Sequence, residues 1–296
     1  MTEIRPDLQY EKSVDGQGTS HQRLGPASAD SDTGYEIQKN INVQHEVEHY
    51  MEKLSIKKAG MSFVRMCFLG LLAGLWVALS CFCAYSVAGG ISEEVVELVP
   101  ILPRLALGFL IPSGLHFIVL FGGEFYSSNC MIVTVGLIKR RISVAAAAEV
   151  LFSSFVFNCL GALAAAYLLG RLTDIFAAEP QLGFIRGFAE YKCNMSPLTI
   201  FLRAIPGNLL VCLSIQMSIS ARDMLGKLAA QHVGVLVQVV AGFEHAVFSL
   251  VLISLGWMHG ASVSSGLVTL LAGAAGNLVG GALMGAGEAA CFGWEE

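Results

Sequence analysis

Long apolar runs dominate the chain after Met61, whereas the first 58 residues are mostly polar. A helix that crosses a bilayer needs roughly 20 mostly apolar residues, and six runs reach that length. They extend approximately over residues 63–89, 101–138, 144–170, 197–220, 225–258 and 263–293. The pattern predicts an all-α polytopic membrane protein with a polar tail over residues 1–58 and a six-span transmembrane domain over residues 59–296.

The second and fifth runs are too long for one plain helix, and each has polar residues in its middle. Gly122 precedes Glu124 in the second run, and Gly242 precedes Glu244 in the fifth. Because glycine is a poor helix residue and a charge at membrane depth is costly, we expect both helices to be interrupted at these points.

The two interruptions belong to an internal repeat. Glu124 and Glu244 are 120 residues apart, and Asn158 and Asn277, in spans three and six, are 119 apart. Spans one and four share a similar four-residue sequence displaced by 134 residues. Each half has three spans, so the second half enters the membrane from the opposite side. In such inverted repeats the interrupted segments meet near the midplane and form the transport site.

Basic residues indicate the orientation of the spans, because Lys and Arg concentrate in cytoplasmic loops. Lys57 and Lys58 precede span one, and three consecutive basic residues, 139–141, follow span two. The opposite loops also carry basic residues, so the bias is modest. It predicts that both termini are cytoplasmic, with the plasma membrane as the default location.

The N-terminal tail has two parts. Residues 1–40 are rich in Ser, Asp, Gly and Gln, which predicts disorder, and no apolar stretch typical of a cleavable signal peptide follows Met1. Residues 41–56 are expected to form an amphipathic helix that leads into span one.

Composition narrows the class of protein further. The 296 residues are 54% hydrophobic and 14% charged, against about 25% charged in soluble domains. This excludes a soluble enzyme, and the net charge of -5 argues against a nucleic-acid partner. The eight cysteines form no CxxC pair, so we expect neither a disulfide framework nor a metal site, and no cofactor.

Ionisable side chains within apolar runs are functional candidates by default, because burying charge in a bilayer is costly. His245 is the strongest, since it lies in the repeat-matched interruption. Imidazole titrates in the physiological pH range, so it can lend a proton to a weak acid. For Glu124 and Glu244 we favour a loop-support role, as hydrogen-bond partners of the interrupted backbone beside Gly122 and Gly242.

The other ionisable side chains in these runs have simpler interpretations. Glu149 and Glu288 lie near cytoplasmic ends, where a carboxylate can snorkel to water. His116 lies on an apolar stretch, which favours a helix contact. Lys192 precedes span four on the outer side, where it either draws anions to the mouth or is an ordinary solvated lysine.

Hydroxyl and amide side chains near the interruptions leave alternatives open. Ser127 and Ser128 either donate hydrogen bonds to a substrate or cap a half-helix. Asn158 and Asn277 have nearby glycines, which favours close helix packing and interhelical hydrogen bonds. Asn208 lacks such glycines, so a pore-facing role is equally open.

With these residues in place, the chain resembles the formate–nitrite transporter family over roughly residues 60–293. The segments that carry the resemblance occur together in the family's order: residues 122–128 (GGEFYSS), 208–213 (NLLVCL), 242–245 (GFEH) and 276–281 (GNLVGG).

The resemblance implies a homopentamer with one aquaporin-like pore per protomer, and small monovalent anions such as formate, nitrite, hydrosulfide and lactate as substrates. It assigns the pore histidine to His245 and the vestibule lysine to Lys192. It also assigns the hydroxyl of the omega-shaped loop to Ser127 and the pore asparagine to Asn208.

Several positions depart from the family's pattern. The constrictions that many members line with Phe align with Ile111 and Gln238, and Tyr126 replaces Phe in the omega-shaped loop. Leu115 and Val211 complete the expected apolar lining. Because Gln238 makes one constriction more polar, the resemblance leaves the selectivity among anions open.

These observations predict a transporter of small weak-acid anions such as formate, nitrite, lactate, acetate or hydrosulfide. An apolar constriction excludes a bare anion, so we expect proton coupling through His245 and passage as the neutral acid. The alternatives are an anion-selective channel, in which a protonated His245 stabilises the anion, and a neutral-solute channel. An Asn-Pro-Ala motif would indicate a neutral-solute channel, and GxSxG a membrane enzyme; neither occurs. Residues 45–49 read HEVEH, which places His45 and His49 on one helix face at i, i+4, but no third metal ligand is apparent, so we interpret this segment as a solvated helix face.

Overall fold

The structure, a computed structural model, describes residues 13–14, 20–21 and 41–292. The chain divides into two units, Met1–Lys39 and Asn40–Glu296. In the first unit, strands β1 (Ser13–Val14) and β2 (Ser20–His21) pair antiparallel. The predicted disorder of residues 1–40 falls on residues that, apart from these four, lie outside the described ranges.

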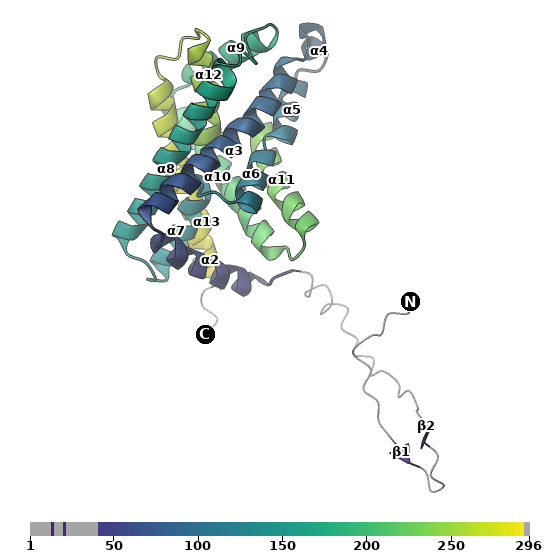
Figure 1. Cartoon of the computed structure of the whole chain (residues 1–296), viewed down its shortest axis with the longest axis vertical. Coiled ribbons are helices and arrows are strands. Elements are labelled where there is room, and N and C mark those ends of the chain that lie inside the picture. Colours follow the sequence, from purple (N-terminus) through teal and green to yellow (C-terminus); the bar gives the residue numbers. More distant parts are fainter. Residues whose placement is uncertain (1–12, 15–19, 22–40, 293–296) are drawn as a thin grey trace. The chain divides into compact units, whose positions relative to one another are not determined.

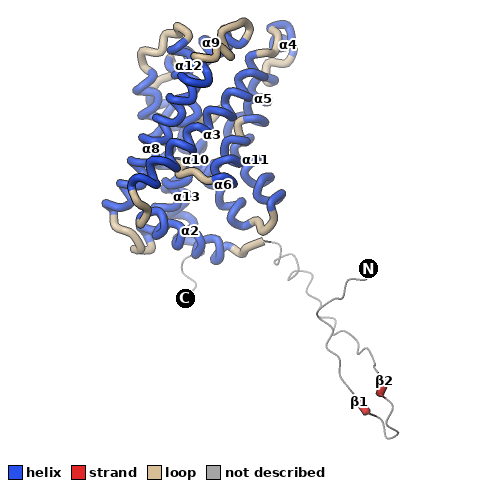
Figure 2. The backbone as a smooth tube through the Cα atoms, viewed as in Figure 1, coloured by secondary structure: helices blue, strands red, loops and turns tan. Residues whose placement is uncertain are grey.

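The second unit is a bundle of helices with its loops gathered mainly at the two ends (Figures 1 and 2). In chain order the helices are α2 (Gln44–Ala59), α3 (Phe63–Gly89), α4 (Glu93–Leu98), α5 (Leu102–Leu110), α6 (Ser113–Phe121), α7 (Tyr126–Ile138), α8 (Val144–Ala165), the π-helical turn η1 (Ala166–Arg171), α9 (Gln181–Cys193), α10 (Pro197–Ser220), α11 (Met224–Ala241), α12 (Ala246–Met258) and α13 (Gly266–Phe292).

Six helical stretches of the described chain are long and apolar enough to cross a membrane, which confirms the predicted fold class. They are Phe63–Gly89, Leu102–Phe121, Val144–Arg171, Pro197–Ser220, Met224–Ala241 and Gly266–Phe292. The shorter apolar helices α7 and α12 complete spans two and five, so both predicted interruptions are present.

Local sequence explains where several spans begin. Ser196 precedes α10, and its hydroxyl accepts a hydrogen bond from the backbone N–H of Thr199 at 3.1 Å, while Pro197 occupies the first helical position. Asp223 caps α11 in the same way through the N–H of Gly226 at 2.8 Å. These caps satisfy N–H groups that have no partner within the helix.

The two halves of the bundle interlock. Span α3 packs against α8, and α10, its equivalent in the second half, packs against α13. The short helix that follows each interruption also contacts the last span of the other repeat: α7 contacts α13, and α12 contacts α8. The two interrupted segments are therefore held between both repeats, at the centre of the bundle.

Close helix contact depends on equivalent glycines in spans three and six. A Cβ atom on Gly161 would lie 2.2 Å from the carbonyl oxygen of Leu71, and one on Gly280 would lie 2.1 Å from that of Ile205. Any larger residue would force α3 from α8 or α10 from α13. Small residues at these positions let the backbones touch, as membrane helices require when no hydrophobic force drives them together.

Helix α2 confirms the helix expected before span one, with bounds three residues later. Val47 and Met51 are fully buried against the bundle, where α2 contacts α7, α8, α10 and α13. Two carboxylates of α2 are buried as well: Glu48 forms an ion pair with Lys139 at 3.0 Å, and Glu52 one with Arg141 at 2.6 Å. Residues 44–59 thus belong to the same compact unit as the six spans.

Candidate functional site

The two interruptions are held by equivalent sets of hydrogen bonds, each made by one asparagine. In the first, the side-chain amide of Asn158 donates to the carbonyls of Gly70 at 2.9 Å and Glu124 at 2.8 Å, and its oxygen accepts from the N–H of Tyr126 at 2.9 Å. The carbonyl of Glu124 and the N–H of Tyr126 belong to the break and have no helical partner, so Asn158 satisfies both of them, and its bond to Gly70 ties the break to α3.

Asn277 does the same for the second interruption. It donates to the carbonyls of Ala204 at 2.9 Å and Glu244 at 3.3 Å, and accepts from the N–H of Ala246 at 2.9 Å. Each partner is the repeat equivalent of a partner of Asn158, 134 or 120 residues further on. The predicted packing role of the two asparagines thus takes the form of backbone support for the loops.

Glycines at the start of each loop let the chain leave the helix. Gly122 has φ of +95° and Gly242 has φ of +79°, a region that residues with a Cβ rarely adopt. The chain then re-enters a helix after Phe125 and after His245, which are the N-cap residues of α7 and α12. The positive ends of two half-helix dipoles therefore lie beside these two residues.

His245 lies in an aromatic enclosure at the centre of the bundle. Its side chain is 2% exposed, stacked on Phe125 with ring centroids 5.5 Å apart and 4.4 Å from the ring of Phe248. Its Nε2 shares a hydrogen bond with the Ser127 hydroxyl at 2.6 Å. Its Nδ1 is buried and has no hydrogen-bond partner within residues 41–292.

The two serines that the sequence left undecided differ in role. Ser127 points its hydroxyl at His245, whereas the hydroxyl of Ser128 donates to the carbonyl of Phe125 at 2.9 Å, within the first turn of α7, and does not cap the helix. Asn208 donates to the carbonyls of Ser127 at 3.1 Å and Asn277 at 2.7 Å. The amide of Asn208 therefore ties α10 to both interruptions, with its oxygen unpaired among the described residues.

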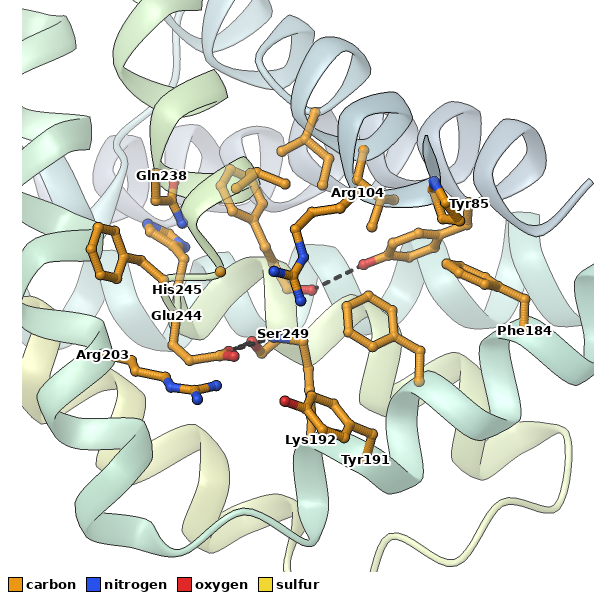
Figure 3. Close-up of a pocket in the computed structure, with 18 of the residues that line it drawn as sticks. Tyr85, Arg104, Phe184, Tyr191, Lys192, Arg203, Gln238, Glu244, His245 and Ser249 are labelled. Carbon is orange, nitrogen blue, oxygen red and sulfur yellow. Dashed lines mark hydrogen bonds and ion pairs between the residues drawn. The ribbon is translucent and has the colours of Figure 1, made fainter. Parts of the chain in front are cut away.

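A pocket of about 250 Å³ leads toward His245 from the end of the bundle that carries α9 (Figure 3). Six of the residues singled out from sequence line it: Ile111, Lys192, Gln238, Gly242, Glu244 and His245. Two arginines that the sequence did not single out also line it, Arg104 and Arg203. Figure 3 shows both guanidinium groups reaching into the pocket.

The charges around this pocket are unequal. Lys192 forms an ion pair with Glu244, whose carboxylate also accepts a hydrogen bond from Ser249 at 3.1 Å. Neither Arg104 nor Arg203 forms an ion pair within the described part of the chain. The pocket therefore carries a surplus of positive charge, which attracts anions.

The contacts of Glu124 and Glu244 differ from our expectation. We expected their carboxylates to hydrogen-bond the loop backbone, but Glu124 pairs with Lys58, and Glu244 pairs with Lys192. Backbone support comes from the asparagines instead, because an amide offers both a donor and an acceptor whereas an ionised carboxylate only accepts. The glutamates support the loops by anchoring them to α2 and α9.

Sequence reasoning missed Lys58, although the signal was present. Lys58 and Lys192 are 134 residues apart, the displacement that relates spans one and four. Arg104 and Arg203 gave no such signal. They lie in spans two and four, which are not repeat equivalents, and only folding brings them to one pocket. From the sequence we assigned the aromatic constriction residue of this loop to Tyr126 and did not name its neighbour Phe125.

All five residues of the predicted constriction are buried, and three of them share one core. Ile111, Leu115 and Val211 belong to the same apolar cluster as Phe125, and Gln238 lies beside Ile111 in the pocket wall. Tyr126 belongs to another cluster: its ring packs 5.0 Å from that of Phe155, and its hydroxyl donates to the carbonyl of Ala274 at 3.0 Å. Because consecutive residues at the start of α7 face different directions, Phe125 takes the position beside the histidine.

Two of the three remaining intramembrane candidates, His116 and Glu288, have hydrogen-bond partners. His116 makes the expected helix contact, with its Nε2 3.1 Å from the carbonyl of Leu228 in α11. Glu288 is buried and accepts a hydrogen bond from Gln216, so it does not snorkel to water as we expected. Glu149 is exposed. Among the described residues, no group of three or more His, Cys, Asp or Glu is placed to hold a metal ion.

Comparisons with known proteins agree with this geometry. A family model described as formate/nitrite transporter matches residues 45–289. A probable formate transporter of Methanothermobacter thermautotrophicus is 31% identical over 243 residues, covering 76% of this chain and 86% of that protein. A formate channel of Bacillus thuringiensis is 27% identical, covering 80% of this chain and 90% of that protein.

Solved structures share the fold. A chain described as an FNT family ion channel superposes with a TM-score of 0.75 at 20% identity, covering 82% of this chain and 97% of that chain. A pentameric formate channel with formate bound superposes with a TM-score of 0.60 at 22% identity, covering 75% and 93%. Because the family model extends from α2 to the last span, the chain belongs to the formate/nitrite transporter family, which consists of multi-pass membrane transporters and channels rather than enzymes.

Proposed function

We propose that this protein moves small monovalent weak-acid anions, formate and nitrite foremost, across a membrane together with a proton. Acetate, lactate and hydrosulfide are the further candidates. The observation that carries the proposal is the position of His245, a titratable ring enclosed by aromatic side chains at the inner end of a positively charged pocket.

The enclosure around His245 supports passage as a neutral acid. Apolar surface surrounds the proposed path beside His245, contributed by Phe125, Phe248 and Ile111. Transferring a small ion from water into such surroundings costs on the order of several kcal/mol or more. Adding a proton to a carboxylate or to nitrite removes most of that cost. Desolvation itself favours the protonated form, because it penalises the charge.

The Ser127–His245 contact supports a proton relay at this point. At 2.6 Å the hydroxyl and Nε2 are within hydrogen-bond reach, and either atom can be the donor. Nδ1 remains available to a permeant, since no described residue pairs with it. In the proposed cycle an incoming anion takes a proton through His245 or from water, crosses as the acid and ionises on the other side.

Charges in the outer pocket support anion capture before the proton transfer. We expected Lys192 to supply the attraction, but Glu244 neutralises it in an ion pair. Arg104 and Arg203 therefore contribute most of the positive field that would concentrate an anion at the mouth. The N-terminal ends of α7 and α12 add partial positive charge near the centre.

Relatives support the substrate class and the assembly. Two similar proteins are described as a probable formate transporter and a formate channel, and one structure of the same fold is described as pentameric with formate bound. We extend these descriptions to this chain as a homopentamer, one pore per protomer, in the plasma membrane with both termini in the cytoplasm.

The test is a substrate panel with the full-length protein in liposomes. Formate, nitrite, hydrosulfide, acetate and lactate uptake is measured with and without an inward proton gradient. We expect the gradient to accelerate uptake of formate, with no net current. An uptake rate that does not change with the proton gradient, together with a measurable current, would favour the anion-channel alternative, in which His245 is protonated and stabilises a bare anion.

A further inference from the structure

Gln238 places an unpaired amide in the apolar wall next to His245. Its side chain is 1% exposed, and it lines the outer pocket together with Ile111 and Leu107. Its Oε1 is buried and has no hydrogen-bond partner among residues 41–292. Figure 3 shows the amide directed toward the histidine, at the inner end of the pocket.

Backbone hydrogen bonds fix the point from which this side chain projects. The carbonyl of Gln238 accepts a hydrogen bond from the N–H of Phe243 at 3.1 Å, and the N–H of Gly242 bonds the carbonyl of Val239 at 3.1 Å. These bonds close the C-terminal end of α11, so the amide projects from the last turn before the interruption. Its position relative to His245 is therefore set by the loop that carries both.

The equivalent position in the first repeat carries no polar group. Gln238 corresponds to Ile118, 120 residues earlier, and Ile118 is buried in the apolar core. The two sides of the central histidine are thus chemically different, although the scaffold is repeated. One unpaired amide in an apolar wall has a large effect, because a buried polar group without a partner is costly and a hydrogen bond there is not diluted by water.

An amide discriminates between the two protonation states of a weak acid. Its oxygen accepts from the O–H of an undissociated acid, while its N–H₂ donates to the carbonyl or nitroso oxygen of the same molecule. An ionised carboxylate offers no donor, so it leaves Oε1 unpaired and places two negative oxygens beside it. Hydrogen sulfide offers only the weak S–H donor and no oxygen acceptor.

From this geometry we infer that Gln238 is a specificity-determining residue, which binds the undissociated oxyacid at the outer constriction and favours oxyacids over hydrogen sulfide. This inference rests on the proposed transport function. It names the oxyacid class, carboxylic and nitrous acids, as the preferred permeants of the site. In this view the arginines at the mouth bind the anion, and the amide next to His245 receives its protonated form.

The test compares Gln238→Met with wild type in liposomes that are loaded under one fixed inward proton gradient. Methionine has nearly the same length and keeps the wall filled but cannot form the hydrogen bonds. Ile118→Met is the matched control, because it alters the equivalent wall position without removing a polar group. Formate and hydrosulfide uptake are measured for each protein, and size-exclusion profiles report folding.

We expect Gln238→Met to lower formate uptake about tenfold, the loss of one good hydrogen bond, while hydrosulfide uptake stays within about twofold of wild type. The Ile118→Met control should move both rates in parallel. An equal fall of both rates in Gln238→Met, or no fall in either, would overturn the inference and leave proton-coupled transport standing.

Two further outcomes complete the test. If wild type moves neither solute in response to the gradient, the proposed function itself fails, and the role of Gln238 fails with it. If Gln238→Met does not give a folded protein, Gln238→Leu is measured in its place with the same expected split between formate and hydrosulfide.

Discussion

Phe125 and His245 occupy equivalent positions in the two repeats, 120 residues apart, and their rings stack with centroids 5.5 Å apart and planes inclined by 19°. The pseudo-symmetry of the scaffold thus pairs a purely apolar ring with a titratable one. Both residues are N-caps of a central half-helix, so both feel the same local backbone dipoles. The repeat supplies the enclosure, and at this position one half carries a phenyl ring and the other an imidazole.

This relationship gives the first prediction. His245→Phe makes the two central positions alike and keeps an aromatic pair there, but removes the group that we propose carries the proton. We expect formate uptake driven by a proton gradient to fall by about 100-fold or more, the range of general acid–base effects. Uptake of labelled formate into liposomes measures the loss. Phe125→Leu, which thins the enclosure but leaves the imidazole, should retain gradient-driven uptake. A His245→Phe protein that transports at the wild-type rate would remove the imidazole from the mechanism.

The adjacent serines provide a second prediction with its own control. The Ser127 hydroxyl is the described partner of His245 Nε2, so Ser127→Ala should shift the pH dependence of uptake and slow it about tenfold. The Ser128 hydroxyl only donates to the carbonyl of Phe125 within α7, so Ser128→Ala should lower the free energy of unfolding by about 1 kcal/mol, the net value of one hydrogen bond, with the pH profile intact. A pH titration of uptake for both variants decides between these roles. Identical profiles would contradict the relay.

A third prediction concerns the two buried ion pairs, Lys58–Glu124 and Lys192–Glu244. Lys58→Met and Lys192→Met each leave a buried carboxylate without its cation, which costs roughly 3–5 kcal/mol. Thermal unfolding in detergent should show a clear fall in Tm for both. Adding Glu244→Gln to Lys192→Met should recover part of the loss, because no uncompensated charge then remains. Single variants as stable as wild type would show that the pairs do not anchor the loops.

The fourth prediction concerns capture of the anion in the outer pocket. Replacing Arg104 and Arg203 together with Gln removes two positive charges that line the pocket, so we expect KM for formate to rise several-fold at low salt with little change in the maximal rate. The rise should shrink near 1 M salt, where the Debye length is about 3 Å. Arg186→Gln is the matched control, because Arg186 instead donates to the carbonyl of His259 at 2.5 Å. A KM that salt and both substitutions leave unchanged would contradict electrostatic capture.

Sequence alone predicted the elements that depend on local pattern. Run length and hydropathy gave the six spans, since a bilayer sets the number of apolar residues that a helix needs. Glycine shortly before glutamate, repeated after 120 residues, located both interruptions, because this pair is unfavourable within a membrane helix. His245 and Ser127 could be singled out together, and the structure puts them 2.6 Å apart.

What the tertiary structure decided is which side chains meet. Side chains that pair lie far apart in the chain, as Lys58 and Glu124 do, and the pattern of apolar positions says nothing about the partner of a polar one. The direction of a side chain just after a break is likewise set by packing, which turns Phe125 to the histidine and Tyr126 away from it. The chain thus encodes its spans and breaks locally, through hydropathy and backbone freedom. The chemistry at the centre arises only when two inverted halves fold against each other.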